Sequence, residues 1–220
     1  MDNNINTIHK YKITKYGYLF FKRLFDIIFG LLGIIFLIPV TIVLKIAYMC
    51  TGDFHSIFFA QDRIGKNGKL FKLFKYRSMI PNAEAKLEEL MYSNKKIRDE
   101  YKKNKKLEDD PRITKIGKFI RRYSIDELPQ LINVFIGSMS IVGPRPYLPR
   151  EKEDMKKYYD SIITCKPGVT GLWQVSGRSD ISFNKRLKLE KEYAEKCSFA
   201  FDVKLFFKTF KAVFGKQGAK

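Results

Sequence analysis

Two adjacent carboxylates, Asp126 and Glu127, have the clearest potential for chemistry in this sequence. Ser124 stands three residues before Glu127, which is the spacing of a capping box at a helix start. The spacing predicts a helix that begins here, with both carboxylates in its first turn, where the positive helix end stabilises negative charge. Side chains of adjacent helical residues point about 100° apart, so one carboxylate could attack while the other holds a metal ion. Helix capping alone would also explain the pair.

Two further segments have residue types suited to phosphate binding. Gly143-Pro144-Arg145-Pro146 holds one arginine between two prolines, and a guanidinium fork matches the oxygen atoms of a phosphate. Lys166–Arg178 is a glycine-rich segment with one tryptophan that ends in an arginine. Its glycines would allow backbone N–H groups to approach an anion closely. Ordinary turns would also explain each segment by itself.

The charge of the chain points to an anionic partner. Lysine and arginine total 42 residues against 23 aspartate and glutamate residues, a formal net charge of +19. Nucleic acid, an anionic membrane surface and phosphorylated substrates all fit this excess. The three cysteines, in no metal-ligand spacing, are interpreted as free thiols. With only two histidines, triads based on histidine and most zinc sites are not expected.

The strongest signal for a structural element is an uncharged apolar run from Ile27 to Leu44. A membrane-spanning helix needs roughly 17–25 apolar residues, so this run is at the short end. Pro39 inside it should bend or break a helix. Basic residues stand at both ends, at Lys22-Arg23 and at Lys45, so the positive-inside rule does not favour a crossing. A re-entrant helix, a single-pass anchor with a kink and a buried core helix remain as alternatives.

Several elements are expected around the carboxylates. Ser56–Ala60 and Leu70–Tyr76, separated by a glycine-containing turn, predict a β-hairpin. Residues 82–107 have helical composition and a lysine-rich end. Residues 113–122 and 202–216 are amphipathic at helical spacing, with apolar faces opposite basic ones. Such helices suit either a membrane interface or packing on a core.

Taken in order, the motifs resemble the bacterial sugar transferase family, the monotopic polyprenyl-phosphate phosphoglycosyl transferases. The resemblance covers essentially all of the chain except its N-terminal arm. It rests on Lys22-Arg23-Leu24-Phe25-Asp26, Gln61-Asp62-Arg63-Ile64-Gly65, Phe74-Lys75-Tyr76-Arg77-Ser78-Met79, Asp110-Pro111-Arg112-Ile113-Thr114, residues 124–146 and residues 167–178.

The resemblance implies an α+β, mostly helical fold. A re-entrant membrane helix and interfacial amphipathic helices would surround a small β-hairpin element. Residues 1–21 would form an N-terminal arm, residues 22–50 the re-entrant helix, and residues 51–220 a catalytic domain that ends in an amphipathic helix. Family members break the re-entrant helix at a Ser-Pro pair, whereas this chain has Ile38-Pro39.

The resemblance also implies roles for residues. Asp126 and Glu127 would be the catalytic pair, with Asp126 attacking the sugar-linked phosphorus of a UDP-sugar and Glu127 binding Mg²⁺. UMP would leave, and undecaprenyl phosphate would take the sugar phosphate from Asp126. The expected substrate-binding residues are Lys75, Arg77, Arg121, Arg145 and Arg178.

The implied location is the bacterial inner membrane, with the catalytic domain on the cytoplasmic face in contact with membrane lipids. The segment at residues 82–107 favours galactose or glucose over N-acetylated hexosamines as the sugar. The product would begin an exopolysaccharide, capsule, O-antigen or glycoprotein glycan. No nucleic-acid partner is expected, and whether the chain forms a homo-oligomer is left open. The rival interpretation is a basic, membrane-anchored protein that binds nucleic acid or anionic lipid.

Overall fold

The computed structural model describes residues 2–104, 107–177 and 181–214. The chain divides into two compact units. The first contains residues 1–38, 60–74 and 129–220, and the second contains residues 39–59 and 75–128. The described part is mostly helical, with two small sheets of two strands each. This agrees with the predicted α+β class.

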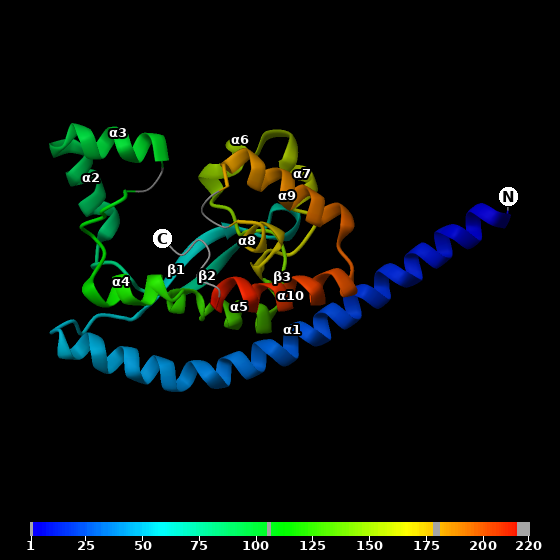
Figure 1. Cartoon of the computed structure of the whole chain (residues 1–220), viewed down its shortest axis with the longest axis horizontal. Coiled ribbons are helices and arrows are strands. Elements are labelled where there is room, and N and C mark those ends of the chain that lie inside the picture. Colours follow the sequence, from blue (N-terminus) through cyan, green and yellow to red (C-terminus); the bar gives the residue numbers. More distant parts are fainter. Residues whose placement is uncertain (1, 105–106, 178–180, 215–220) are drawn as a thin grey trace. The chain divides into compact units, whose positions relative to one another are not determined.

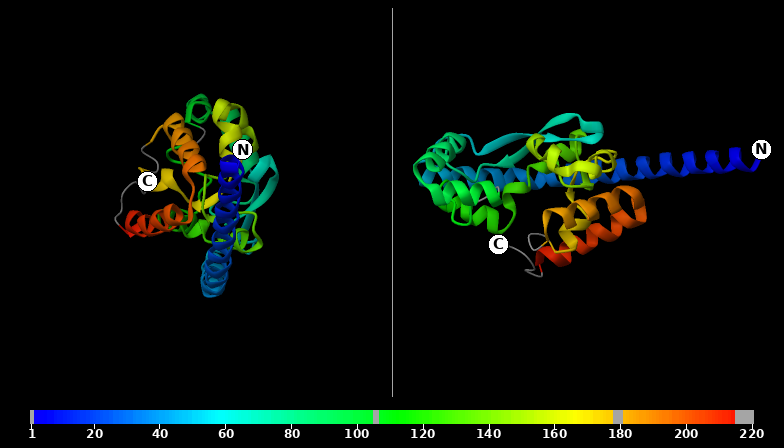
Figure 2. Two further views of the ribbon diagram at one scale, coloured as in Figure 1. Left: turned by 90° about the vertical axis from the view of Figure 1, so that its right-hand side faces the viewer. Right: turned by 90° about the horizontal axis from the view of Figure 1, so that it is seen from above.

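Helix α1 (Asp2–Cys50) is a single continuous ribbon with Pro39 inside it (Figure 1). The same continuity is visible in both views of Figure 2. Its stretch Tyr16–Cys50 is long and apolar enough, by length and composition, to cross a membrane. Most of its large apolar side chains are exposed, among them Leu32, Phe36, Ile38 and Val43. The helix therefore does not end at Pro39, while a re-entrant path through a membrane stays a prediction.

The polar side chains in the first part of α1 contact the first unit. Asp26 is buried and accepts hydrogen bonds from the Ser140 hydroxyl and the Ile141 N–H. Lys22 forms an ion pair with Asp202 at 2.5 Å. Buried charges need such partners. These contacts leave the uncharged stretch that follows as the exposed apolar surface of α1.

Strands β1 (Phe58–Ile64) and β2 (Leu70–Tyr76) pair with each other and are joined by a short turn containing η1 (Lys66–Gly68). The predicted hairpin is confirmed, although its first strand lies later than Ser56–Ala60. The turn uses Asn67 and Gly68 at positive φ angles of 56° and 76°, a conformation that asparagine and glycine tolerate.

The described residues of the second unit form three further α-helices. These are α2 (Ala83–Ser93), α3 (Lys95–Asn104) and α4 (Lys115–Arg122). The predicted helical region is therefore two helices, separated at Asn94, whose ψ of 109° is extended. Helix α4 is the expected basic amphipathic helix, and the Thr114 hydroxyl caps it by accepting from the Gly117 N–H. Capping of this kind satisfies a donor that the helix itself leaves unpaired.

The predicted helix start at Ser124 is wrong. Residues Ile125–Glu127 form a single 3₁₀ turn, η2, and helix α5 (Gln130–Ile136) begins only after Pro129. Ser124 lies in the left-handed region with a φ of 56° and makes no side-chain cap. The N–H of Glu127 instead bonds the Ser124 carbonyl at 3.3 Å. An N-cap residue is typically extended, so the left-handed backbone of Ser124 explains the loss of the capping box.

The rest of the first unit is built on a parallel strand pair that sequence analysis missed. Strand β3 (Ser140–Val142) pairs with β4 (Gly168–Thr170). Short helices connect them: η3 (Pro149–Glu151), α6 (Lys152–Met155), η4 (Lys156–Tyr158) and α7 (Tyr159–Ile162). Helices α8 (Leu172–Val175), α9 (Phe183–Lys196) and α10 (Phe199–Phe214) follow. The core here gathers Leu73, Val134, Met139, Ile141, Val142, Tyr193 and Leu205.

Glycines allow β3 and β4 to approach each other. A Cβ at Gly168 would lie 2.1 Å from the Gly143 nitrogen, and a Cβ at Gly143 would lie 2.3 Å from the Lys166 carbonyl oxygen. Both contacts are with backbone atoms, which cannot rotate away. The chain at this point therefore requires residues without a side chain.

We expect Gly168→Ala to lower the free energy of unfolding by about 2 kcal/mol or more, because the added methyl forces the strands apart. Thermal unfolding of the detergent-solubilised protein measures the loss. Gly17→Ala is the matched control, because a Cβ there meets nothing within 4 Å. Equal melting temperatures for the two variants would contradict the close approach.

Candidate functional site

Asp126 and Glu127 lie in the 3₁₀ turn η2, directly after the left-handed residue Ser124. A left-handed backbone at a non-glycine residue costs about 1–2 kcal/mol, and such residues are often found at functional sites. Asp126 is mostly buried, with 13% of its side chain exposed, whereas Glu127 has 44% exposed. The pair thus offers one enclosed carboxylate and one open carboxylate.

Lys75, at the end of β2, is the cation nearest to both carboxylates. Its Nζ lies 3.0 Å from Glu127 Oε1 and 3.9 Å from Asp126 Oδ2. Only 22% of the lysine side chain is exposed. The structure therefore places the predicted residues Lys75, Asp126 and Glu127 together.

The environment of Asp126 has opposing effects on its pKa. Burial raises the pKa of Asp126 most, and the like charge of Glu127 raises it further. The positive charges of Lys75 and Arg121 lower it, and the net result is a raised pKa. A carboxylate that is desolvated yet held next to a cation is a more basic nucleophile than one in water.

Arg121, the third basic residue of this cluster, lies in the last turn of α4. Its Nε donates to the Ser78 hydroxyl at 2.8 Å. Helix α4 packs closely on that segment, since a Cβ at Gly117 would lie 1.8 Å from the Ser78 carbonyl oxygen. The exposed Arg121 is thus held close enough to the carboxylates to lower the pKa of Asp126.

Arg77 has a different environment from Lys75. It is buried, and its guanidinium donates to the carbonyls of Ser56 and Met79 and to Asp53, at 2.7, 2.9 and 2.9 Å. Tyr48 donates to its carbonyl and lies under its guanidinium. These contacts make Arg77 a residue that fixes the end of β2, and binding of substrate by Arg77 stays a prediction.

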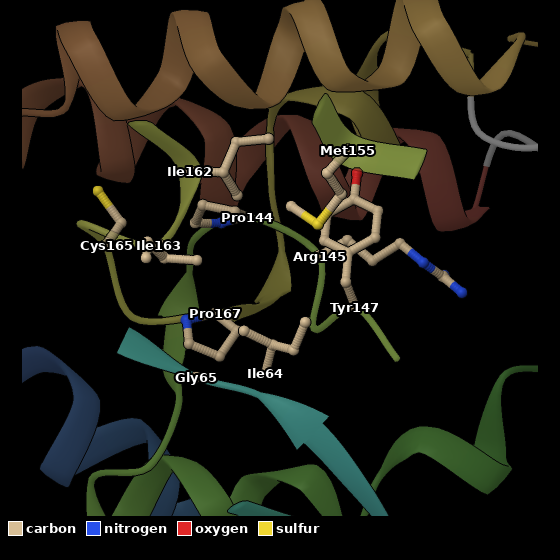
Figure 3. A pocket seen from close by; sticks show the side chains of 10 residues that line it. All are labelled: Ile64, Gly65, Pro144, Arg145, Tyr147, Met155, Ile162, Ile163, Cys165 and Pro167. Atoms are coloured by element: carbon tan, nitrogen blue, oxygen red, sulfur yellow. The ribbon is translucent and has the colours of Figure 1, made fainter. Parts of the chain in front are cut away.

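Arg145 belongs to a second cluster, in the first unit. Its N–H donates to Glu190 Oε1 of α9 at 2.9 Å, and its guanidinium lies 5.7 Å from the ring centre of Trp173 in α8. Arg186 of α9 lies on the same ring at 4.5 Å. In Figure 3 the Arg145 guanidinium extends away from a small apolar cavity, which is lined by Ile64, Gly65, Pro144, Tyr147, Met155, Ile162, Ile163, Cys165 and Pro167.

Glu190 is fully buried in this second cluster. Its Oε1 accepts the Arg145 N–H, and its Oε2 has no hydrogen-bond partner. Burial raises the pKa of Glu190 to about 8, although the hydrogen bond from Arg145 and the charges of Arg145 and Arg186 lower it. The carboxyl group is therefore mostly protonated at neutral pH.

Sequence analysis missed Arg186 and Glu190. They are one turn apart on α9, at the spacing that places two side chains on the same helix face. In the sequence of α9 alone, they look like the other charged residues that face solvent. Their role becomes visible only when the structure shows that they contact Trp173 and Arg145. Arg178, the remaining predicted site residue, lies outside the described residues.

The residues described by the structure include no group of three or more histidine, cysteine, aspartate or glutamate side chains that could hold a metal by themselves. Mg²⁺ usually binds one or two carboxylates and completes its shell with water and substrate phosphates. The adjacent carboxylates of Asp126 and Glu127 fit that mode.

Comparison with known proteins places the chain in a family. Residues 17–216 match the family model of the bacterial sugar transferases. The chain belongs to this family, as the motif order indicated.

Named relatives agree with this assignment. The chain is 42% identical over 200 residues to the undecaprenyl-phosphate galactose phosphotransferase of Salmonella typhimurium, covering 91% of this chain and 42% of that protein. It is 43% identical over 198 residues to an uncharacterized sugar transferase of Haemophilus influenzae, covering 90% of this chain and 42% of that protein. The chain therefore spans about two fifths of the length of these two relatives. It is 41% identical over 202 residues to the exopolysaccharide production protein ExoY of Sinorhizobium fredii, covering 90% of this chain and 87% of that protein.

We expect Arg77→Met to lower the free energy of unfolding by about 3 kcal/mol at pH 7, because it leaves two carbonyls without their donor and removes the cationic partner of Asp53. Burial raises the pKa of Asp53, but hydrogen bonds from Arg77 and His55 lower it by more. Ionised Asp53 therefore contributes stability at neutral pH that is lost as the pH falls through its lowered pKa. Unfolding measured at pH 7 and pH 3 should show the variant's deficit shrinking in acid.

Lys72→Met is the control for this prediction. Lys72 pairs with Asp62 at 2.9 Å, but both side chains are about half exposed or more. Exposed pairs contribute about 0–1 kcal/mol. A deficit as large as that of Arg77→Met would mean that burial is not the reason for the role of Arg77.

Proposed function

We propose that the chain transfers a sugar-1-phosphate from a UDP-sugar to undecaprenyl phosphate, releasing UMP, by way of a covalent intermediate on Asp126. The observation that carries the proposal is an enclosed carboxylate, Asp126, next to an open carboxylate, Glu127, with the ammonium of Lys75 within 3.9 Å of both. The family and the name of the Salmonella relative, an undecaprenyl-phosphate galactose phosphotransferase, support the transfer of a sugar phosphate to undecaprenyl phosphate.

The first step follows from the environment of Asp126. Its carboxylate oxygen bonds to the sugar-linked phosphorus while the bond from that phosphorus to the oxygen of UMP breaks, and UMP leaves with the electron pair. Because Asp126 is desolvated and its pKa is raised, its oxygen is a better nucleophile than an exposed carboxylate. Lys75 and Arg121 would neutralise the negative charge that two carboxylates and a diphosphate bring together.

The second step uses the same residues in reverse. An oxygen of undecaprenyl phosphate attacks the phosphorus, and the Asp126 carboxylate leaves as the product diphosphate forms. Splitting the transfer at one carboxylate predicts ping-pong kinetics. Lys75 stabilises Asp126 again as it regains its charge.

Mg²⁺ is the proposed cofactor. Glu127, with nearly half of its side chain exposed, would hold it together with phosphate oxygens of the substrate. When bound, the ion supplies charge neutralisation for the diphosphate. Lys75 would then have to share Glu127 with the metal, which its flexible stem allows.

The exposed apolar stretch of α1 suits contact with membrane lipids. We place the protein in the bacterial inner membrane, with its catalytic residues on the cytoplasmic face, where UDP-sugars occur. The product would enter exopolysaccharide, capsule or related glycan assembly, as the name of the Sinorhizobium relative suggests. Galactose and glucose are the first donors to test. Nucleic-acid binding, the rival function, does not explain why a carboxylate, Asp126, is enclosed next to Glu127 and Lys75.

Asp126→Asn should abolish UMP release, because an amide cannot replace the nucleophilic carboxylate. The assay supplies Mg²⁺, undecaprenyl phosphate and UDP-sugars to protein in nanodiscs. The exposed Asp154 gives the control Asp154→Asn, which should retain full activity. Activity in Asp126→Asn above about one hundredth of the original would contradict the covalent step.

The pH dependence of UMP release should shift when Lys75 is replaced. Lys75→Met removes a charge that lowers the Asp126 pKa, so the acidic limb should move to higher pH. This follows because the nucleophile must be ionised. An acidic limb that stays in place, or moves to lower pH, would exclude Asp126 as the titrating group.

A further inference from the structure

Arg145 and Arg186 carry like charges on one aromatic ring. Their guanidinium groups lie 5.7 and 4.5 Å from the centre of the Trp173 ring. Among the described residues, the contacts of the two guanidinium groups are with this ring, and neither has a carboxylate oxygen within 4.0 Å. Both Nε atoms and the indole nitrogen are buried and have no hydrogen-bond partner. Such an arrangement opposes folding unless something offsets the repulsion.

The Glu190 carboxyl group does little to offset it at neutral pH. Glu190 is fully buried and uses Oε1 to accept the Arg145 N–H. Its raised pKa keeps it mostly protonated at pH 7. Burial, together with the positive charge of Arg145, also lowers the pKa of Arg186. Glu151, which accepts the Leu148 N–H, also interacts electrostatically with Arg186. The cluster therefore keeps a net positive charge, with two guanidinium groups against the one carboxylate of Glu151.

The backbone around the cluster is rigid. Gly143 and Gly168 bring β3 and β4 together, and the Gly168 N–H bonds the Pro144 carbonyl at 2.7 Å. Pro144 and Pro146 restrict the backbone on each side of Arg145, and Glu190 fixes its N–H. Arg186 is one turn before Glu190 on the same helix. A site with fixed donors loses little entropy when an anion binds.

We propose that Arg186 and Trp173 join Arg145 in an anion site that takes a phosphate group. Two forked guanidinium groups match the several oxygens and the multiple negative charge of a phosphate ester or diphosphate better than a single carboxylate. Trp173 holds the two forks in place through cation–π contact. Glu190 is a positioning residue that acts through the Arg145 backbone.

The identity of the phosphate rests on the proposed function, which offers two sources: the diphosphate of the UDP-sugar and the phosphate of the lipid. Both present the same chemistry to arginine. One experiment therefore tests whether the site binds a phosphate, and a second tests which substrate supplies that phosphate.

Binding can be measured without catalysis, because Trp173 is the one tryptophan of the 220-residue chain. Inorganic pyrophosphate, titrated into the full-length protein in nanodiscs at constant ionic strength, should change its fluorescence saturably. Arg186→Gln should weaken the apparent affinity about tenfold or more, since a charge-assisted contact is lost. Lys188→Gln removes the same charge from an exposed position on α9 and should change it less than about twofold.

Stability distinguishes a binding site from a structural cluster. Because Arg186 is repelled by Arg145, Arg186→Gln should melt at the same temperature as the original protein or higher, while Arg186→Lys should retain part of the affinity. No saturable fluorescence change, or equal affinities in Arg186→Gln and Lys188→Gln, would overturn the anion site. A large drop in melting temperature in Arg186→Gln would also overturn it, since Arg186 would then be structural.

Kinetics identify the source. A raised KM for the UDP-sugar alone in Arg186→Gln assigns the site to the nucleotide diphosphate, and a raised KM for undecaprenyl phosphate alone assigns it to the lipid. Unchanged KM values for both would overturn the assignment to these substrates. If the unmodified protein released no UMP, the proposed function would fail, while the pyrophosphate titration would still decide the anion site.

Discussion

The attraction between the Lys75 ammonium and two neighbouring carboxylates is the interaction on which the candidate chemistry depends. Asp126 has little access to water, and Glu127 adds a second negative charge beside it. Without a cation at this distance, the pKa of Asp126 would be raised further by burial and by Glu127, which disfavours the ionised form that the chemistry needs. The 3₁₀ turn η2 holds the two carboxylates, and the end of β2 holds the lysine. The positions of these charges therefore depend on the backbone. Contacts of Tyr48 and Arg77, and the close packing at Gly117, hold that backbone in place.

The cluster around Trp173 has the opposite balance of charge. At the carboxylate pair, one lysine faces two acids, whereas here two arginines face a carboxyl group that is mostly neutral. The first cluster therefore has an excess of negative charge, and the second has an excess of positive charge. In the proposed reaction, the first cluster would bind a metal ion and provide the nucleophile, and the second would bind the oxygens of a phosphate.

How far the sequence predicted the structure depended on how local each signal was. The hairpin, α4 and the apolar helix follow from patterns within about ten to twenty residues, and all three were predicted. The helix start at Ser124 was wrong because a capping box describes side chains, while the backbone of Ser124 adopts a left-handed conformation that the pattern cannot reveal. Strands β3 and β4 are three residues each and 25 residues apart along the chain, so no local periodicity marks them.

The same distinction applies to the candidate site residues. Asp126, Glu127, Lys75 and Arg121 were predicted through motif order, and the structure brings these four together. The partners of Arg145 could not be predicted in that way. Glu190 and Arg186 are about 40 residues away along the chain, and only the fold brings α9 next to the loop at Pro144–Pro146.

The fold also explains why so basic a chain buries acidic residues at separate points. Asp26, Asp110, Glu190 and Asp202 are all buried, and each anchors a backbone N–H, an arginine or a lysine. A buried acid that binds a backbone N–H fixes one segment against another, as Asp26 does for Ile141. With these acids committed to structure, the basic side chains that remain at the surface keep their charge available. The excess of positive charge itself comes from the composition, 42 basic against 23 acidic residues, and it enables the protein to attract phosphorylated molecules and anionic lipid surfaces alike.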